Sequence, residues 1–272
     1  PGAVVLGDAP AAYDATTFEP WGALLTGGTL AIAPPGVLSL DELAAHVERE
    51  QCTVAWLTAG VFHAMADAAA LVRLGTLRCL LTGGDVVSPD AVRRVMARWP
   101  ALTVVNGYGP TENTTFTAVH VLRPGEAVPT PLPIGRPIAN GVVRVVRDDG
   151  DAATDGDVGE LWAGGDGLAL GYLRAADDAG RFVADAEGER WYRTGDRARW
   201  APDGVLEFLG RLDAQVKIRG HRVEPGDTEA WLRTCAGVSD AAVVVTGEDA
   251  RRMLAAAVTA VVPTLDIDAM LQ

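Results

Sequence analysis

The amino-acid sequence predicts an α/β protein: a mostly parallel, helix-covered sheet, then a small β-rich lobe, then the start of a small α+β subdomain. Strand-like and helix-like patterns alternate up to residue 105, which favours a parallel sheet with helices on both faces. Prolines recur four times between residues 129 and 137, and short strand-like runs without helices follow them. A strand, a helix and two further strands after Arg211 predict the α+β part.

Start signals predict the helices of the first part. Ser39 and Glu42 form a capping box, in which each side chain bonds the other residue's backbone N–H, and residues 43–47 continue as an amphipathic helix. Ser88 followed by Pro89 predicts another helix start, because proline suits the first helical position. The expected helices are 39–47, 61–70 and 88–96, and the expected strands are 53–57, 77–81 and 102–105.

The later elements are shorter. Apolar runs predict strands at 142–146, 160–163 and 205–209, with a hairpin turn at Asp203-Gly204. In the final part we expect a strand at 216–218, a helix at 228–234, and strands at 242–245 and 254–261.

Composition excludes several classes of function. The chain has 272 residues and a net charge of −13, so we expect no nucleic-acid partner, since binding to phosphate backbones needs clustered Lys and Arg. No apolar run reaches membrane-spanning length, so we expect no membrane partner. Cys52, Cys79 and Cys235 show no paired spacing and are expected to be reduced thiols of a cytoplasmic protein.

The most informative segment is the decapeptide Asn106–Thr115, which follows a short buried strand. We expect the strand to end where glycine and proline begin. Glycines let a backbone approach a ligand closely, and Tyr108 offers a flat face on which a ring can stack. Thr111 next to Glu112 suits a phosphate oxygen and the hard cation that accompanies it. The alternative is a Gly-Pro turn whose Thr and Asn side chains cap a helix.

Four further motifs surround the decapeptide in a fixed order. They are Tyr13–Trp21, Gly159–Tyr172, Tyr192–Asp196 and Gly210–Glu224. With the decapeptide they closely resemble the core motifs of adenylation domains of non-ribosomal peptide synthetases, in the adenylate-forming enzyme superfamily. The resemblance covers essentially the whole chain.

The resemblance implies an enzyme that joins an amino acid carboxylate to the α-phosphate of ATP and releases pyrophosphate. The aminoacyl adenylate is then captured by a phosphopantetheine thiol. It implies ATP and Mg²⁺ as cofactors, and a small amino acid and the phosphopantetheine of a peptidyl carrier protein domain as partners. A small activator protein is a further candidate partner.

The resemblance also implies roles for residues of the nucleotide site. Glu112 would hold Mg²⁺, and Thr111 would bond an α-phosphate oxygen. Tyr108 would stack on adenine with Asn106 near its exocyclic amine, and the backbone of Gly83-Gly84 would lie against the ring.

The later motifs imply further roles. Asp196 would bond both ribose hydroxyls, and Arg211 would contact the ribose or the phosphates; a turn carboxylate and a surface ion pair are the alternatives. Asp213 matches the hinge of the C-terminal lobe. Lys217, the only lysine of the chain, matches a loop that faces the active site during thioester formation, although compositional bias would also explain it.

Asp14 matches the aspartate that pairs with the substrate's α-ammonium group, which implies an amino acid rather than an aryl or fatty acid. The matching pocket positions are Ala15, Phe18, Trp56, Leu81, Gly83, Gly107, Thr115 and Phe116. Three aromatic rings without a charge describe a small apolar pocket similar to those of valine-selecting domains. Isoleucine and 2-aminobutyrate fit it as well, because one methylene gives little discrimination. For Trp56 and Phe116, ordinary core packing is the alternative.

For the organisation of the chain, the resemblance implies that residues 1–212 are the C-terminal part of the large subdomain, with an α/β core to about residue 128. Residues 213–272 would be the hinge and an incomplete C-terminal subdomain. The family's phosphate-clamping loop and its C-terminal catalytic lysine have no match in this sequence. We therefore expect the chain as given to adenylate poorly or not at all, although its parent protein would be active.

Two other functions fit parts of the sequence. An acyl- or aryl-CoA ligase of the same superfamily would share the nucleotide motifs, but Asp14 argues against it. A catalytically silent fragment that binds a carrier or activator protein would leave the retained nucleotide-site residues unexplained.

Overall fold

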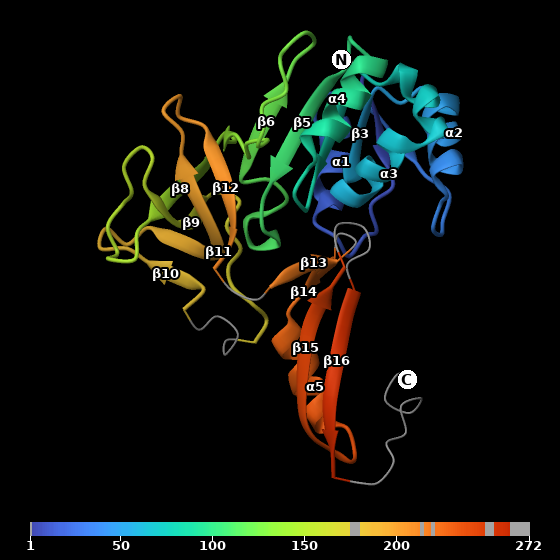
Figure 1. Ribbon diagram of the computed structural model, residues 1–272. Coiled ribbons are helices and arrows are strands. Elements are labelled where there is room, and N and C mark those ends of the chain that lie inside the picture. The colour runs from blue at the N-terminus through green and yellow to red at the C-terminus, as the bar shows by residue number, and fades with distance from the viewer. Residues whose placement is uncertain (1, 175–179, 213–214, 219–220, 248–252, 262–272) are drawn as a thin grey trace. The chain divides into compact units, whose positions relative to one another are not determined.

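The computed structural model describes residues 2–174, 180–212, 215–218, 221–247 and 253–261. The chain folds as two compact units, Pro1–Gly210 and Arg211–Gln272. The predicted fold class is confirmed: a sheet with parallel strands carries helices, and a second, antiparallel sheet follows it (Figure 1).

The first sheet has seven strands in the order β2-β1-β3-β4-β5-β6-β7. The strands are β1 (Val4–Gly7), β2 (Thr29–Ile32), β3 (Val54–Thr58), β4 (Cys79–Gly83), β5 (Thr103–Tyr108), β6 (Ala118–Leu122) and β7 (Arg136–Pro137). The first five pair in parallel, and β6 and β7 add antiparallel strands at one edge.

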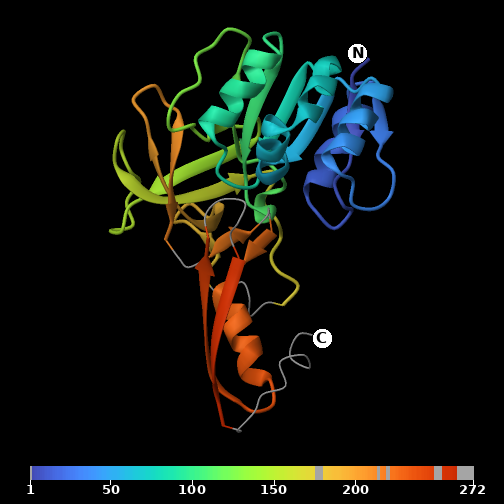
Figure 2. The same cartoon turned by 45° about the vertical axis from the view of Figure 1, so that its right-hand side comes forward.

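Helices cover both faces of this sheet (Figure 2). They are α1 (Ala15–Leu24), α2 (Leu40–Arg49), α3 (Ala59–Asp67) and α4 (Pro89–Arg98), with short 3₁₀ segments η1 (Ala69–Thr76) and η2 (Thr111–Asn113). The chain steps from β1 outward to β2 through α1 and then back across the sheet through α2, α3 and α4. Since such crossovers are right-handed, α1 lies on the face opposite the other three helices.

The predicted helix starts are confirmed. Ser39 and Glu42 form the capping box of α2, and the Ser88 hydroxyl caps α4, with Pro89 at its first position. The core under these helices is aliphatic, with Leu57, Leu80 and Val104 of the central strands almost completely buried.

The second sheet has the order β10-β11-β9-β8, with β12 paired to β11. The strands are β8 (Gly141–Val146), β9 (Val158–Gly165), β10 (Phe182–Ala184), β11 (Arg190–Trp200) and β12 (Leu206–Arg211). The expected turn at Asp203-Gly204 is present, with Gly204 at φ 72°. Val145, Leu161 and Leu206 form its core together with Ala118 and Ile134 of the preceding segment.

The second unit contains β13 (Val216–Ile218), β14 (His221–Val223), α5 (Pro225–Thr234), β15 (Val238–Thr246) and β16 (Met253–Ala260). All four elements expected here are present. Leu232 of α5 packs on Ala241 and Val243 of β15.

Two expectations about element ends are wrong. Strand β5 does not end before the glycines but runs through Gly107 to Tyr108, because pairing to β4 and β6 continues that far. The helix expected at 61–70 begins at Ala59 and ends at Asp67, and η1 carries the chain onward.

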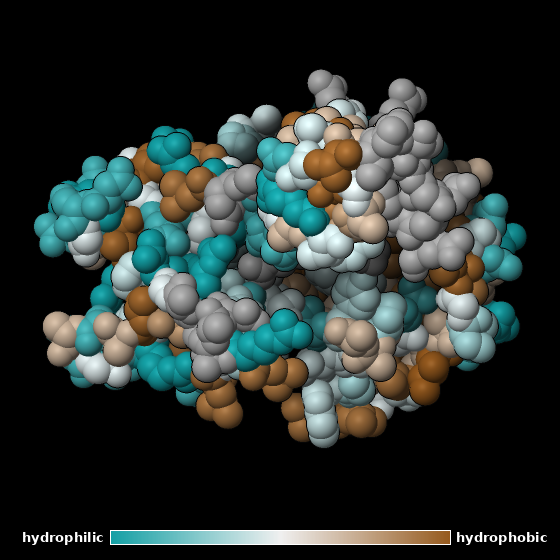
Figure 3. Space-filling view, turned by 90° about the horizontal axis from the view of Figure 1, so that it is seen from below, coloured by the Kyte–Doolittle hydropathy of each residue, from teal (hydrophilic) through white to brown (hydrophobic). Residues whose placement is uncertain are grey.

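No helix among the described residues is both long enough and apolar enough to cross a membrane. On the face seen from below, hydrophilic and hydrophobic residues are interspersed (Figure 3).

Candidate active site

The carboxyl ends of β3, β4 and β5 bring four of the predicted pocket residues onto one face of the sheet. Trp56 pairs with Leu81, and Gly83 pairs with Gly107. Residues two apart on a strand, and residues paired across strands, share a face. This face is opposite the one where Leu57, Leu80 and Val104 meet the α2–α4 core, so it is the face that carries α1.

Three aromatic rings pack against one another in this part of the site. The ring of Phe116 contacts Trp56 edge-on at 5.4 Å and Phe18 of α1 at 5.8 Å between centroids. A Cβ on Gly107 would lie 2.3 Å from the Phe116 ring, and a Cβ on Gly83 would lie 2.0 Å from the Gly107 carbonyl oxygen. Glycine is therefore required at both positions, because any larger residue would collide with these atoms. The three rings, predicted as separate pocket positions, are brought together.

Asp14 lies at the start of α1 and meets the decapeptide. The Thr115 backbone N–H donates to the Asp14 carboxylate at 3.3 Å, and the Thr115 hydroxyl donates to the Asp14 carbonyl at 2.7 Å. The Asp14 side chain does not cap its own helix. Ala15, the next residue, is buried.

The backbone beside Asp14 is strained. Thr114 and Thr115 have φ values of 51° and 66°, in the left-handed region that β-branched residues avoid. Hydrogen bonds from their hydroxyls, to the Gly167 carbonyl and to the Asp14 carbonyl respectively, hold them there. Strain of this kind concentrates at binding sites, where it fixes a geometry the chain would not otherwise adopt.

Alternate residues of β5 face opposite sides. Gly107 faces the aromatic rings, so Asn106 and Tyr108 face the other way. The Tyr108 ring packs near Phe208 of β12, with centroids 6.4 Å apart, and its hydroxyl donates to the Asp196 carboxylate. The Asn106 side-chain N–H₂ donates to the Pro133 carbonyl at 2.8 Å, a bond that does not use its amide oxygen.

Asp196 stands at an irregularity of β11. The pairing of β11 with β9 shifts register between Arg193 and Arg197, which is a β-bulge. Gly195 in the bulge has φ 71°, and the Thr194 hydroxyl donates to the Leu161 carbonyl at 2.6 Å. Such bulges redirect side chains, and here the bulge turns the Asp196 carboxylate towards Tyr108.

Gly84 and Thr111 are two further predicted nucleotide-site residues. Gly84 has φ 76°, a value that favours glycine, and no atom lies within 4 Å of an added Cβ, so the space beside its Cα is open. Thr111 is exposed at the start of η2.

The Glu112 carboxylate is buried, with 7% of the residue exposed, and accepts a hydrogen bond from the Tyr172 hydroxyl. The Tyr172 hydroxyl lies 3.2 Å from the hydroxyl of fully buried Tyr192. Burial, together with the neighbouring Glu112 carboxylate, raises the pKa of Tyr172 above its ordinary value, so this hydroxyl is a hydrogen-bond donor at neutral pH.

The residues present fit magnesium as part of a metal–nucleotide complex. No group of three His, Cys, Asp or Glu side chains among the described residues forms a metal cage. Mg²⁺ keeps several waters and binds one or two carboxylates together with substrate phosphates, a role for which Glu112 suffices. Three of the predicted site residues, Asp14, Glu112 and Asp196, are carboxylates, so an anionic triphosphate bound near them would need a cation.

Three predicted residues are outside the described part of the first unit. Arg211 and Lys217 are in the second unit, Arg211 at the end of β12 and Lys217 in β13, so the first unit does not test their roles. Asp213 lies outside the described residues.

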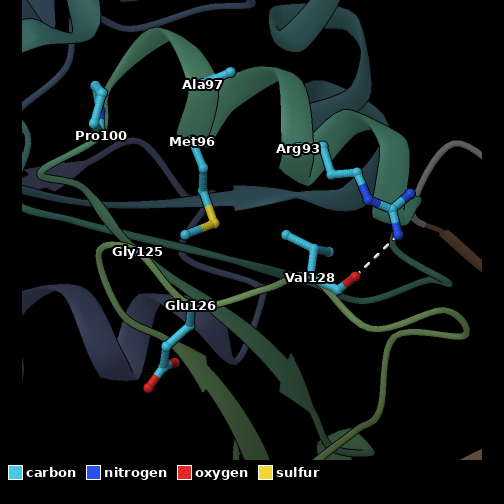
Figure 4. Close-up of a pocket in the computed structure, with 7 residues that line it drawn as sticks. All are labelled: Arg93, Met96, Ala97, Pro100, Gly125, Glu126 and Val128. Atoms are coloured by element: carbon cyan, nitrogen blue, oxygen red, sulfur yellow. Dashed lines mark hydrogen bonds between the residues drawn. The ribbon is translucent and has the colours of Figure 1, made fainter.

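Sequence reasoning missed the roles of Tyr172, Tyr192 and Phe208. Both tyrosines stand inside motifs that the sequence singled out, so their presence was visible, but no local pattern links them to Glu112. An open groove of about 320 Å³ between α4 and the segment after β6 contains none of the predicted site residues (Figure 4). Arg93 crosses it to the Val128 carbonyl.

Comparisons with known proteins identify the family of the chain. The AMP-binding enzyme family matches residues 1–173. A linear gramicidin synthase from Brevibacillus parabrevis is 48% identical over 242 residues, 87% of this chain and 3% of that protein. Tyrocidine synthase 3 from the same organism is 42% identical over 241 residues, 87% of this chain and 4% of that protein.

Solved structures agree in fold. Holo-PA1221, a non-ribosomal peptide synthetase protein with adenylation and carrier domains, has a TM-score of 0.89 and 39% identity over 98% of this chain. The chain spans 47% of PA1221 and a few per cent of the peptide synthases. The chain belongs to the AMP-binding enzyme family, and its relatives there are the adenylation domains of non-ribosomal peptide synthetases.

Proposed function

We propose that the protein containing this chain activates an amino acid with ATP, forming the aminoacyl adenylate and pyrophosphate. The observation that carries the proposal is the alternation along β5. Gly107 on one side borders the Phe116 ring, while Tyr108 on the other side donates to the Asp196 carboxylate, and Asn106 faces the same side as Tyr108. One strand thus separates an apolar guest site from a nucleotide site, with Thr111 and Glu112 directly after it.

In this proposal each residue binds or orients one part of the two substrates. Tyr108 supports the adenine ring, and the Asn106 amide oxygen accepts from its exocyclic amine. Asp196 accepts from the ribose hydroxyls, and Thr111 donates to an α-phosphate oxygen. Glu112 holds Mg²⁺, which neutralises phosphate charge when bound. Positioning and charge neutralisation are the main contributions a protein makes to such chemistry.

The proposed substrate is L-valine or another small aliphatic amino acid. Asp14 would pair with its α-ammonium group, since this carboxylate is already fixed by Thr115. The side chain would meet Phe18, Trp56 and Phe116, with Leu81 at the base of the pocket. The role of Asp14 favours an amino acid over the benzoate or fatty acid of a CoA ligase.

We further propose that the adenylate is passed to the phosphopantetheine thiol of a peptidyl carrier protein. Support comes from the solved relatives, of which PA1221 contains an adenylation and a carrier domain. Arg211 would contact the ribose or the phosphates. The hinge Asp213 and Lys217 would act in the change between the two half-reactions, as in the family they resemble. A small activator protein is a further proposed partner.

The test is ATP–pyrophosphate exchange by the full-length parent protein. We expect the strongest exchange with valine, weaker exchange with isoleucine and 2-aminobutyrate, and none with lysine or benzoate. Exchange with benzoate but with no amino acid would replace the proposal by an aryl-acid ligase, and no exchange with any of these acids would overturn it. The same assay on residues 1–272 alone checks the expectation that this piece adenylates poorly.

A further inference from the structure

The segment between β9 and β10 is fastened to the turn that carries Glu112. The Ala169 backbone N–H donates to the Glu112 carbonyl at 2.8 Å, and the Thr114 hydroxyl donates to the Gly167 carbonyl at 2.7 Å. A Cβ on Gly167 would lie 3.0 Å from the Asn113 carbonyl oxygen. The two segments are therefore in direct contact, although more than 50 residues separate them.

From this segment Tyr172 reaches the Glu112 side chain. Its hydroxyl donates to Oε1 of Glu112, and its ring meets Phe182 of β10 edge-on at 5.5 Å between centroids. Phe182 in turn contacts the ring of Tyr192, 5.1 Å away, and pairs with it across β10 and β11. The contacts with Phe182 hold the Tyr172 ring in place, while the Tyr172 hydroxyl holds the Glu112 carboxylate.

A single carboxylate that supplies the protein's share of a Mg²⁺ shell must be held in one orientation. Mg²⁺ demands nearly ideal octahedral geometry, and a glutamate side chain otherwise rotates about its last torsion. A hydrogen bond to Oε1 fixes that rotation and thereby the direction of the second oxygen. Removing a group that holds a metal ligand in this way typically lowers metal affinity or activity about 10- to 100-fold.

We propose that Tyr172 is a positioning residue that orients the Glu112 carboxylate for the metal of the metal–nucleotide complex. The inference rests on the proposed function, in which Glu112 is the magnesium ligand. Tyr172 itself contacts neither the nucleotide nor the amino acid in this scheme. It acts only through Glu112.

The test measures metal binding directly, by paramagnetic resonance titration of Mn²⁺ into the full-length protein saturated with the non-reacting analogue α,β-methylene-ATP. Tyr172→Phe keeps the ring on Phe182 and removes only the donor. We expect its Mn²⁺ affinity to fall about tenfold. The affinity for the analogue without metal should change less than about twofold, and unfolding temperature should show that the variant is folded. Unchanged Mn²⁺ affinity in Tyr172→Phe would overturn the proposal.

Two further variants separate positioning from packing. Tyr192→Phe removes a neighbouring hydroxyl of the same kind and leaves the bond to Glu112, so we expect a clearly smaller loss; an equal loss would assign the effect to the buried tyrosine pair. In a Glu112→Gln background, Tyr172→Phe should cause no further loss of Mn²⁺ affinity. Independent, additive losses would show that Tyr172 does not act through Glu112.

The outcome is distinguishable from failure of the proposed function. If the parent protein gives no amino-acid-dependent exchange, the proposed function falls, while the Mn²⁺ titrations still decide whether Tyr172 orients Glu112. If exchange occurs and Glu112→Gln binds Mn²⁺ as tightly as the native protein, activation of an amino acid stands, whereas the role of Glu112 as metal ligand falls and the inference falls with it.

Discussion

Thr115 holds Asp14 from two sides: its backbone N–H donates to the carboxylate at 3.3 Å and its hydroxyl donates to the carbonyl at 2.7 Å. The two residues are 101 positions apart in the chain. The contact joins the start of α1 to the end of the decapeptide and fixes a carboxylate beside the residue that precedes Phe116. A carboxylate held in advance binds an ammonium group without the cost of ordering it first.

Asp14→Asn keeps the shape of the side chain and removes its charge. Because a hydrogen bond between charged partners contributes about 1.5–3 kcal/mol, kcat/KM for valine should fall about 10- to 100-fold. The KM for ATP should stay within about twofold, since the proposed nucleotide site is on the other side of β5. Exchange kinetics check both values. Asp41→Asn, an exposed aspartate in the first turn of α2, is the matched control and should behave as the native protein. Equal effects on valine and ATP would contradict the assignment.

Gly107→Ala and Gly83→Ala should fail in different ways. At Gly107 the new methyl group meets the Phe116 ring at 2.3 Å, so we expect a higher KM for valine with the fold retained. At Gly83 it meets the backbone carbonyl of Gly107 at 2.0 Å, so we expect a lower unfolding temperature. Thermal unfolding and exchange kinetics on both variants separate the two effects.

Gly60→Ala is the control for the glycine variants. Gly60 lies in α3 with no atom within 4 Å of an added Cβ, and alanine there should raise stability by about 0.5–1 kcal/mol. If Gly107→Ala destabilised the protein as strongly as Gly83→Ala, the Phe116 ring would not be moving aside to accommodate the new methyl group.

Tyr108→Phe removes the hydroxyl that donates to Asp196 and keeps the ring. We expect the KM for ATP to rise severalfold with the KM for valine unchanged, because only the carboxylate proposed to bind the ribose loses a hydrogen bond. Asp196→Ala should in addition reduce discrimination between ATP and 2′-deoxy-ATP, since a site built to bond a hydroxyl rejects the analogue that lacks it. Undiminished discrimination in Asp196→Ala would exclude a ribose contact at this residue.

Glu19 makes stability depend on pH. It is 2% exposed, and burial raises the pKa of its carboxyl above the ordinary 4.5, although the backbone N–H groups of Asp8 and Ala9 donate to it. The folded state therefore keeps this proton to a higher pH than the unfolded chain does. Stability from this group is highest at low pH and is lost as the pH rises from about 4.5 through the raised pKa.

Glu19→Gln removes this titration and keeps an oxygen for the backbone N–H groups. The fall in unfolding temperature with rising pH should become shallower in the variant, although Asp8, whose pKa burial also raises, still contributes. Glu48→Gln, on the exposed side of α2, is the control and should leave the profile unchanged. Parallel profiles for Glu19→Gln and the native protein would show that Glu19 is not the group responsible.

Elements with strong local signals were predictable. The capping box of Ser39 and Glu42 and the Ser88-Pro89 start depend only on neighbours along the chain, and both helices begin where expected. The end of β5 was predicted wrongly, because Gly107 reads locally as a breaker whereas pairing on both sides keeps it in the strand. In that position glycine is needed for the approach of Phe116 and not for a turn.

The amino-acid sequence alone determined the fold class and the family. Composition, helix starts and the order of the motifs can all be recognised along the chain without knowing which distant residues meet. Only the tertiary structure decided which residues meet. Gly107 and Tyr108 are adjacent in sequence, yet they face opposite sides of the sheet because they are successive residues of one strand. Tyr172 reaches Glu112 across 60 positions, and no periodicity encodes that contact. Such contacts form only when sheet pairing and core packing bring distant segments together. Closing the intervening chain costs conformational entropy, and interactions between neighbours in sequence do not offset that cost.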